Sequence, residues 1–265
     1  MFVEIGLSLT IPSLRFFETA ECTVPKSNEV WAHASICCMT LDLSTATLPE
    51  IAAHYAAPHS PWLRANMVIS SDGKFVGATG TSRDLTNALD LRLLLLLRGM
   101  SDVVLVGANT ARNESYRQPK LRPEFAFLGR RAPRLALVTR SLNFDLDSVL
   151  FHGGDSRTIV FHTGDQVPSK QLQEVAELIP VNSATDVIAK LHEMQLPLIT
   201  CEGGPNLLAQ LLAADLVDEY DLTVSPVLSG KSSESTGAEV DLEHWQVLSS
   251  ATADDFTFLR HTRRA

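Results

Sequence analysis

From about residue 61 onward, apolar and polar positions follow two alternating spacings. Short apolar runs of strand length occupy Leu63–Ser70, Asp102–Val106, Arg134–Thr139, Thr158–His162, Leu196–Cys201 and Val217–Val224. Longer segments with helical spacing lie between them, at Ser82–Arg98, Ser169–Leu178, Ala184–Met194 and Pro205–Ala214. Strands that alternate with helices are typical of βαβ units. The pattern therefore predicts an α/β fold with a mostly parallel central sheet and helices on both faces.

The two ends of the chain break this pattern. Near the C-terminus, His244–Ser250 and Phe256–Thr262 resemble two paired strands, so we expect antiparallel strands at one sheet edge. Residues 1–60 show no sustained period and only weak helical stretches, near Ser13–Ala20 and Pro49–Ala57. We interpret 1–60 as an N-terminal extension that packs on a main domain of residues 61–265.

Composition narrows the function classes. The chain has 265 residues and a net charge of -9, which argues against a broad nucleic-acid surface. Its apolar runs fall short of the roughly 20 residues of a membrane span, and Met1–Thr10 lacks the basic start of a signal peptide. The cysteines at 22, 37, 38 and 201 show no metal-ligand spacing, so we expect reduced thiols, no metal and a cytoplasmic protein.

The strongest candidate for chemistry is the segment from Leu198 to Leu208, where a strand runs into Gly203-Gly204 and a helix starts at Pro205. Paired glycines allow the backbone to approach a ligand, and a helix N-terminus favours phosphate. The same residues could simply form a tight turn between a strand and a helix. The segment lacks the GxGxxG pattern of dinucleotide-binding folds.

Two further strand ends carry polar residues. Gly107-Ala108-Asn109-Thr110 repeats the strand, glycine and helix order, although Asn109 and Thr110 could equally cap the helix. Thr139-Arg140-Ser141 follows the strand from Arg134 and suits a 2′-phosphate, which would favour NADPH over NADH, or forms a solvated turn.

Two loops are weaker candidates. Ser71-Asp72-Gly73-Lys74 reads first as a hairpin turn, although Lys74 could point into a cleft. The segment Arg112–Arg122 holds several basic side chains that could clamp a phosphate or lie in solvent. The sequence contains no GxSxG, HExxH or Walker A motif, so hydrolase and kinase functions lack local support.

Taken together, these segments resemble the reductase domain of riboflavin biosynthesis, the RibD C-terminal family, whose fold is that of dihydrofolate reductase. The resemblance runs from about residue 61 to the C-terminus. It is carried by five short segments in order: Pro61–Asn66 before Ser70–Lys74; Gly80-Thr81-Ser82; Arg98 before Val104–Thr110; Glu202–Leu207; and Leu216–Tyr220 before Ser225–Leu228.

The resemblance implies a three-layer α/β sandwich, a homodimer, and NADPH-dependent reduction of 5-amino-6-(5-phosphoribosylamino)uracil to its ribitylamino form. It implies that Glu202 and Arg98 contact the substrate, and that Arg117, or next Arg122, holds the substrate phosphate. We expect the cofactor to contact a larger set, namely Ser82, Gly107, Asn109, Thr110, Glu114, Thr139, Arg140, Ser141, Gly203, Gly204, Pro205, Asn206 and Leu207.

The chemistry of the reaction suggests roles for three residues. Opening of the ribose gives an imine at C1′ that accepts a hydride, and a nearby carboxylate favours the protonated imine. Glu202 is the first candidate for that carboxylate and Asp72 the second, while Lys74 could orient hydroxyl groups or supply a proton.

Two departures from the family pattern leave alternatives open. The loop after Thr110 departs from the acidic and proline pattern of the family, although Glu114 could replace one acid. No deaminase zinc motif precedes the domain. A reductase of another pteridine or pyrimidine such as dihydrofolate, or a non-catalytic nucleotide-binding protein, would share the cofactor half.

Overall fold

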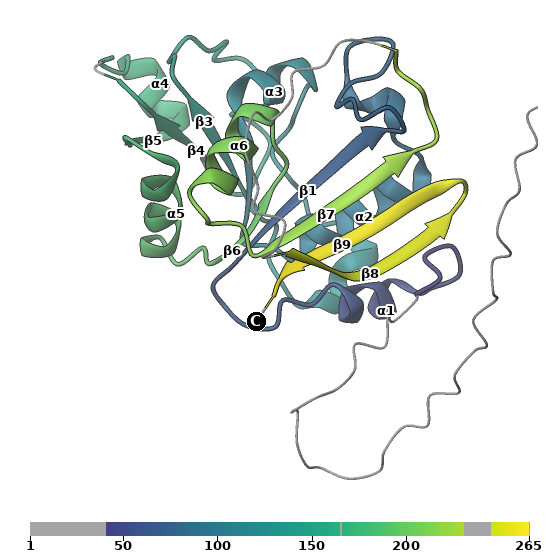
Figure 1. Cartoon of the computed structure of the whole chain (residues 1–265). Helices are drawn as coiled ribbons and strands as arrows, with labels where there is room; N and C mark the ends of the chain where they lie inside the picture. Colours follow the sequence, from purple (N-terminus) through teal and green to yellow (C-terminus); the bar gives the residue numbers. More distant parts are fainter. Residues whose placement is uncertain (1–40, 165, 231–244, 265) are drawn as a thin grey trace, which may run out of the picture. The chain divides into compact units, whose positions relative to one another are not determined.

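A computed structural model describes residues 41–164, 166–230 and 245–264. They form a nine-stranded sheet in the order β5-β4-β3-β2-β6-β1-β7-β9-β8 (Figure 1). The strands are β1 Trp62–Ser70, β2 Val103–Gly107, β3 Arg134–Thr139, β4 Thr158–His162, β5 Ala176–Pro180, β6 Leu198–Cys201, β7 Glu219–Ser225, β8 Trp245–Ala253 and β9 Phe256–Arg263.

The strands from β5 to β7 run parallel, whereas β9 pairs antiparallel with both β7 and β8. This arrangement confirms the predicted α/β fold with an antiparallel C-terminal edge. Strand β2 is buried from Val103 to Val106, as a central parallel strand covered on both faces should be.

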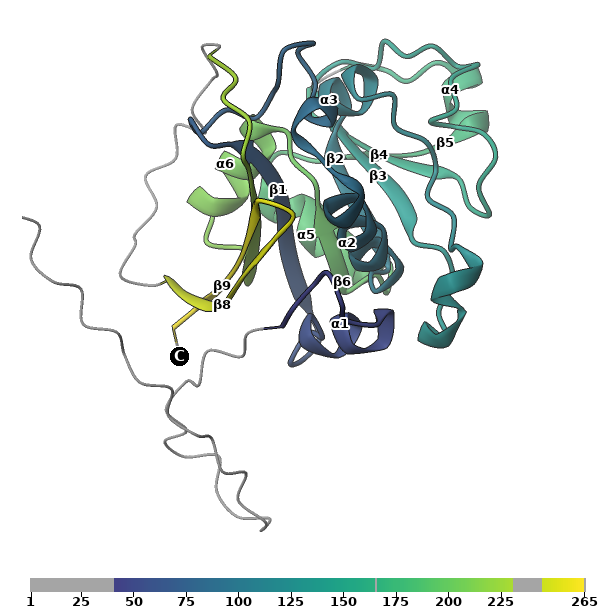
Figure 2. The ribbon, with the colours of Figure 1, turned by 90° about the vertical axis from the view of Figure 1, so that its right-hand side faces the viewer.

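Helices cover both faces of the sheet. They are α1 Leu48–His54, α2 Ala88–Gly99, α3 Ala108–Asn113, α4 Lys170–Val175, α5 Ala184–Glu193 and α6 Pro205–Ala213, with short 3₁₀ helices η1 Ser82–Leu85 and η2 Pro123–Leu128. Figure 2 shows α2 and α6 on opposite sides of β1. One core cluster joins α5 and α6 to the sheet, and another joins α1 and α2 to β8 and β9. Among the described residues, no helix is long and apolar enough to cross a membrane.

Residues 41–60 belong to the same compact unit as the sheet. Helix α1 starts with a capping box, in which the Thr47 N–H donates to Glu50 (2.8 Å) and the Glu50 N–H donates to Thr47 Oγ1 (3.4 Å). Leu43 and Ile51 are buried in the cluster that α2 shares. The other weak helical stretch expected in this region, Ser13–Ala20, lies outside the described residues.

Two predicted helices were wrong in extent. The Ser82–Arg98 segment divides into η1 and α2, because Asn87 caps α2 by accepting the Asp90 N–H at 2.8 Å. In Ser169–Leu178, α4 ends at Val175 and β5 follows, since the open side of β4 offers hydrogen bonds to an added strand. In both cases the contacts made in the fold override helical spacing.

The hairpin expected at Asp72-Gly73 was also wrong. The turn is present, with the Gly73 N–H donating to Ser70 O at 2.9 Å and Gly73 at φ +75°. Both sheet neighbours of β1 are parallel strands, β6 and β7, so the turn leads into η1 instead of an adjacent strand. The consequence for function is that this turn lies at the carboxyl end of β1.

Candidate active site

The glycine turn after β6 is shaped by close neighbours. Gly203 has φ +81° and its peptide bond to Gly204 is cis. A Cβ atom on Gly203 would lie 3.0 Å from Met67 Cε, and one on Gly204 would lie 2.3 Å from Thr110 Oγ1. The turn therefore accepts only glycine at both positions without a shift of its neighbours.

A second turn, between β2 and α3, packs directly against the first. The Gly107 N–H donates to Gly203 O at 2.7 Å. Both α3 and α6 start without a side-chain cap, at Gly107 and Gly204. Two adjacent helix starts without side-chain acceptors leave backbone donors for an anionic ligand such as a pyrophosphate.

A cleft of about 230 Å³ opens at this carboxyl edge of the sheet. Its lining comes from β1, the turn that follows it, η1, α2, α3 with the loop after it, and the glycine turn. The lining residues are Asn66, Met67, Val68, Phe75, Val76, Gly80, Ser82, Thr86, Asp90, Leu94, Asn109, Thr110, Asn113, Glu114, Tyr116, Glu202, Gly204 and Pro205. Ligands of parallel α/β sheets bind at this edge. We call it the carboxyl-edge cleft.

Glu202 lies in this cleft with both carboxylate oxygens engaged. Arg98 donates from Nε to Oε1 and from Nη2 to Oε2, each at 2.6 Å, and Tyr116 Oη donates to Oε2 at 2.7 Å. The Glu202 side chain is only 3% exposed. The structure thus brings Glu202 and Arg98 together as a bidentate ion pair. Oε1 accepts a single donor here and keeps capacity for another.

Asp90, near the start of α2, is a second carboxyl group in the cleft. It is 6% exposed, accepts a hydrogen bond from Thr86 Oγ1 and interacts with the Thr223 hydroxyl. Burial raises the pKa of Asp90 above that of a free aspartic acid, although the two hydroxyl groups act in the opposite direction. Asp90 therefore keeps its proton to higher pH than an exposed aspartate.

Glu114 forms part of the rim. Its Oε1 accepts the Ser82 N–H at 2.7 Å, and the Arg83 guanidinium donates to its backbone carbonyl. Glu114 therefore ties η1 to the loop after α3. Six of the residues predicted to contact a cofactor line the cleft, namely Ser82, Asn109, Thr110, Glu114, Gly204 and Pro205.

The remaining cofactor candidates do not line the cleft. Asn206 is exposed and Leu207 is buried in the core. Thr139 is buried at the end of β3, donating to Ser141 O at 2.7 Å, while Arg140 and Ser141 are exposed. Because β3 neighbours β2, this polar turn lies beside the Gly107 turn on the same edge.

Four candidates for catalysis or phosphate binding lie outside the lining. Asp72 accepts from Ser70 Oγ (2.6 Å) and from two backbone N–H groups of residues 229 and 230 (both 2.9 Å), which lower its pKa to about 2. Lys74 is half-buried, and its backbone N–H donates to Ser70 Oγ at 2.8 Å. Arg117 is exposed, and Arg122 pairs with Glu124 at 3.6 Å. None of the described lining residues is a lysine or an arginine.

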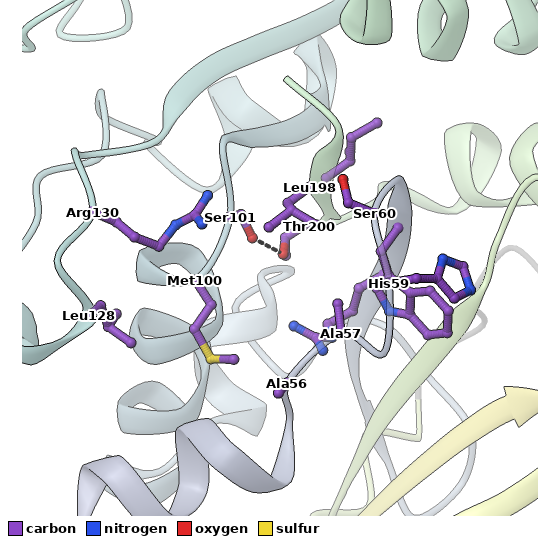
Figure 3. Close-up of a pocket in the computed structure, with 13 residues that line it drawn as sticks. Ala56, Ala57, His59, Ser60, Met100, Ser101, Leu128, Arg130, Leu198 and Thr200 are labelled. Carbon is purple, nitrogen blue, oxygen red and sulfur yellow. Dashed lines mark hydrogen bonds between the residues drawn. The ribbon is translucent and has the colours of Figure 1, made fainter. Parts of the chain in front are cut away.

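A second cavity, of about 310 Å³, lies at the opposite edge, where β1 and β6 begin. Figure 3 shows Ser101 and Thr200 bonded within it (2.5 Å), with Met100, Leu128 and Leu198 as apolar walls. Its arginines are committed to neighbours, since Arg64 binds Glu219 (2.8 Å) and Arg130 pairs with Asp102. We call it the amino-edge cavity.

The sequence matches a known protein family over most of its length. The family model described as the RibD C-terminal domain matches residues 61–257. The chain belongs to the RibD C-terminal domain family. This membership confirms the resemblance inferred from the short segments around Asp72-Gly73, Gly107–Thr110 and Glu202–Leu207.

Curated relatives of the chain are named either for riboflavin biosynthesis or for reduction of a ribosylaminopyrimidinone phosphate. It is 23% identical to riboflavin biosynthesis protein RibD of Aquifex aeolicus, over 67% of this chain and 49% of that protein, so it spans about half of that relative. It is 26% identical to 2,5-diamino-6-ribosylamino-4(3H)-pyrimidinone 5′-phosphate reductase of Methanothermobacter thermautotrophicus, over 64% of this chain and 80% of that protein.

Solved structures show the same fold. A pyrimidine reductase-like protein from Corynebacterium diphtheriae matches with a TM-score of 0.66 and 26% identity, covering 77% of this chain and 92% of that one. The riboflavin biosynthesis reductase Rib7 of Saccharomyces cerevisiae matches with a TM-score of 0.56 and 16% identity, covering 82% of this chain and 99% of that one.

Two cleft residues, the buried Asp90 and the half-buried Tyr116, were not predicted from the sequence. Asp90 lies in the first turn of a leucine-rich helix, where an acidic side chain usually does no more than interact favourably with the helix dipole. Tyr116 follows Ser115, which has φ +50°, and no periodic signal marks it. The one available signal is that Asp90 falls on a helix face that is otherwise apolar, with Leu93 and Leu97 three and seven positions later.

Proposed function

We propose that this protein is an NADPH-dependent reductase that converts a phosphorylated ribosylaminopyrimidine to its ribitylamino form in riboflavin biosynthesis. The observation that carries the proposal is the pair of abutting glycine turns, Gly107 and Gly203-Gly204, beside a cleft with two buried carboxyl groups, Asp90 and Glu202. The named activities of the family relatives supply the substrate class.

The residues present suit a dinucleotide. Side chains at Gly203 or Gly204 would collide with Met67 or Thr110, so glycine at both positions allows this turn to pack closely beside the start of α3. Ser82, Asn109 and Thr110 add polar side chains at the cleft wall. Thr139, Arg140 and Ser141, at the end of the neighbouring strand, are the proposed contacts for the 2′-phosphate. When bound, NADPH supplies the hydride.

We assign two distinct roles to the cleft carboxyl groups. Reduction at C1′ adds one hydride to carbon and one proton to the attached nitrogen. Burial raises the pKa of Asp90, so its acid form persists to higher pH than that of an exposed aspartate, and Asp90 is our candidate donor to that nitrogen. Glu202 is fixed by Arg98 and Tyr116, and its Oε1 has room for a substrate hydroxyl or N–H.

Asp72 receives a structural role instead of a catalytic one. Asp72 clamps the turn after β1 to residues 229 and 230, and its low pKa makes it a poor proton donor.

Arg117 remains our first choice and Arg122 our second for the substrate phosphate, although each would have to approach the cleft from its exposed position. A homodimer in the cytoplasm remains part of the proposal, and light scattering of the purified chain tests its oligomeric state.

The test is NADPH oxidation with three substrates in parallel. The uracil and the 2,5-diaminopyrimidinone forms of the phosphoribosylamino compound are compared with dihydrofolate. We expect turnover of at least one phosphoribosylamino compound and none of dihydrofolate. Turnover of dihydrofolate alone would replace the proposed substrate, and NADPH binding without turnover of any pyrimidine would favour a non-catalytic nucleotide-binding protein.

A further inference from the structure

The turn Glu114-Ser115-Tyr116 joins the proposed cofactor side of the cleft to its substrate side. It follows α3, whose first residues stand against the glycine turn. The Tyr116 N–H donates to Ala111 O at 2.8 Å, and Ser115 takes φ +50°, so the backbone turns back towards the sheet. Tyr116 thereby leaves α3 in a fixed direction.

The Tyr116 side chain ends on the ion pair. Its hydroxyl donates to Glu202 Oε2 at 2.7 Å, and the Arg98 guanidinium carbon lies 5.2 Å from the centre of its ring. Burial, reinforced by the Glu202 carboxylate, raises the pKa of Tyr116 well above that of a free tyrosine. The raised pKa favours the neutral hydroxyl, which is the form that donates to Glu202.

We propose that Tyr116 is a positioning residue of the reductase, which fixes the Glu202 carboxylate for the substrate and links that carboxylate to the cofactor-binding start of α3. The proposal rests on the proposed function. Arg98 alone would hold Glu202 in a planar pair, and the hydroxyl adds a third contact from a different element. A third contact restricts rotation of the carboxyl group, and small errors in position cost rate in hydride transfer.

The central test replaces Tyr116 by phenylalanine, which removes the hydroxyl and keeps the ring against Arg98. We expect kcat to fall about tenfold or more, with the Kd for NADPH unchanged within twofold. Tyr220→Phe is the matched control, since Tyr220 lies on β7 beside His261 and outside the cleft lining. Full kcat in Tyr116→Phe would overturn the proposal, as would an equal fall in the control.

A double-mutant cycle separates positioning from packing. If Tyr116 acts through Glu202, then Tyr116→Phe should slow the Glu202→Gln enzyme much less than it slows the wild type. The fold-decreases in kcat caused by Tyr220→Phe and by Glu202→Gln should multiply in the double variant, because the two residues act independently. If the fold-decreases caused by Tyr116→Phe and by Glu202→Gln also multiply, the proposal is contradicted.

The same cycle can be measured without substrate, by denaturant unfolding of the four proteins. We expect a coupling between Tyr116 and Glu202 of about tenfold in the unfolding equilibrium constant. If the two substitutions change the free energy of unfolding additively, the side chains do not interact and the proposal is wrong. If the wild type reduces no pyrimidine, the proposed function fails and the positioning role falls with it, while the unfolding cycle still reports whether the contact exists. If Glu202→Gln does not fold, the Tyr116→Phe kinetics and NADPH binding still decide.

Discussion

The two edges of the sheet offer cavities of opposite character. The amino-edge cavity is the larger, at about 310 Å³ against about 230 Å³ for the carboxyl-edge cleft. Its guanidinium groups are already paired, Arg64 with Glu219 and Arg130 with Asp102. The cleft instead has two glycine turns with helix starts that lack side-chain caps, and the buried carboxyl of Asp90. The candidate site is therefore identified by polar groups at the carboxyl ends of the strands that can bind a ligand, and not by the volume of the cavity.

The buried charges near the amino edge have a structural explanation. Glu219 accepts from Trp62 and from both Arg64 and Arg260, all at 2.8 or 2.9 Å. The two arginines also donate to carbonyl groups at the end of α1, namely those of residues 54, 55 and 56. This cluster attaches α1 to β1, β7 and β9. Its guanidinium groups are held by carboxylate and carbonyl groups of the protein.

The largest effect should come from Asp90→Asn, which keeps the size of the side chain and removes the proton donor. We expect kcat to fall about 100-fold or more, the usual range for loss of a general acid. Steady-state kinetics with a phosphoribosylamino pyrimidine measure this change. The matched control is Asp218→Asn at the amino edge, where burial also raises the aspartate pKa and the carboxylate accepts the Leu63 N–H at 2.7 Å.

The pH profile sharpens the same comparison. Because the pKa of Asp90 is raised, its protonated form persists above the usual aspartate range, and kcat should fall as pH rises through that raised value. The Asp90→Asn enzyme should lose this fall in kcat at high pH, and the Asp218→Asn enzyme should keep it. If the fall in kcat is unchanged in Asp90→Asn, Asp90 does not transfer the proton.

Glu219→Gln should affect stability instead of chemistry. It removes the carboxylate that the buried Arg64 and Arg260 share, with Asp221 left 3.0 Å from Arg64, and breaking such a buried cluster costs about 3–5 kcal/mol in the free energy of unfolding. Denaturant unfolding measures the loss. At a temperature where the variant is folded, kcat should stay near that of the wild type, and a large fall in kcat would show that the two edges are coupled.

Gly204→Ala tests the glycine turn. The added methyl group would lie 2.3 Å from Thr110 Oγ1, so the turn or Thr110 must shift. We expect NADPH affinity to fall about tenfold, or about 1.4 kcal/mol, with partial recovery in the Gly204→Ala, Thr110→Ala double variant. Calorimetric titration measures both. Gly129→Ala is the control away from the cleft: a Cβ there meets nothing within 4 Å and φ is +61°, so alanine should strain the backbone and leave NADPH affinity unchanged.

The smallest effect should come from Arg140→Ala. Loss of one charge-assisted contact to a 2′-phosphate should weaken NADPH binding several-fold and leave NADH binding unchanged. The exposed Arg131 provides the control, since Arg131→Ala removes an equal charge elsewhere. If Arg140→Ala weakens both cofactors equally, the 2′-phosphate lies elsewhere.

The fold was largely predictable because long-range pairing follows simple local signals. Buried runs such as Val103–Val106, together with the glycines after β2 and β6, indicate parallel strands and the edge at which they end. The errors arose where tertiary contacts decide: Asn87 capped a new helix inside Ser82–Arg98, and β4 drew Ala176–Pro180 into the sheet.

The site was predictable in part for the same reason. Backbone turns such as Gly203-Gly204 are encoded locally, and so is Glu202 beside them. The partners of Glu202 are not, because Arg98 and Tyr116 reach it across 104 and 86 residues of sequence. Asp90 was missed because its burial depends on β7, which supplies Thr223.

The most direct test of the account is NADPH oxidation by wild type, Glu202→Gln and Asp218→Asn with a phosphoribosylamino pyrimidine, alongside calorimetric NADPH binding to each. The account predicts turnover by wild type and Asp218→Asn. It predicts NADPH binding of similar strength in all three proteins and a fall in kcat of about tenfold or more in Glu202→Gln alone. No turnover by the wild type, or full turnover by Glu202→Gln, would contradict the assignment of the carboxyl-edge cleft as the active site.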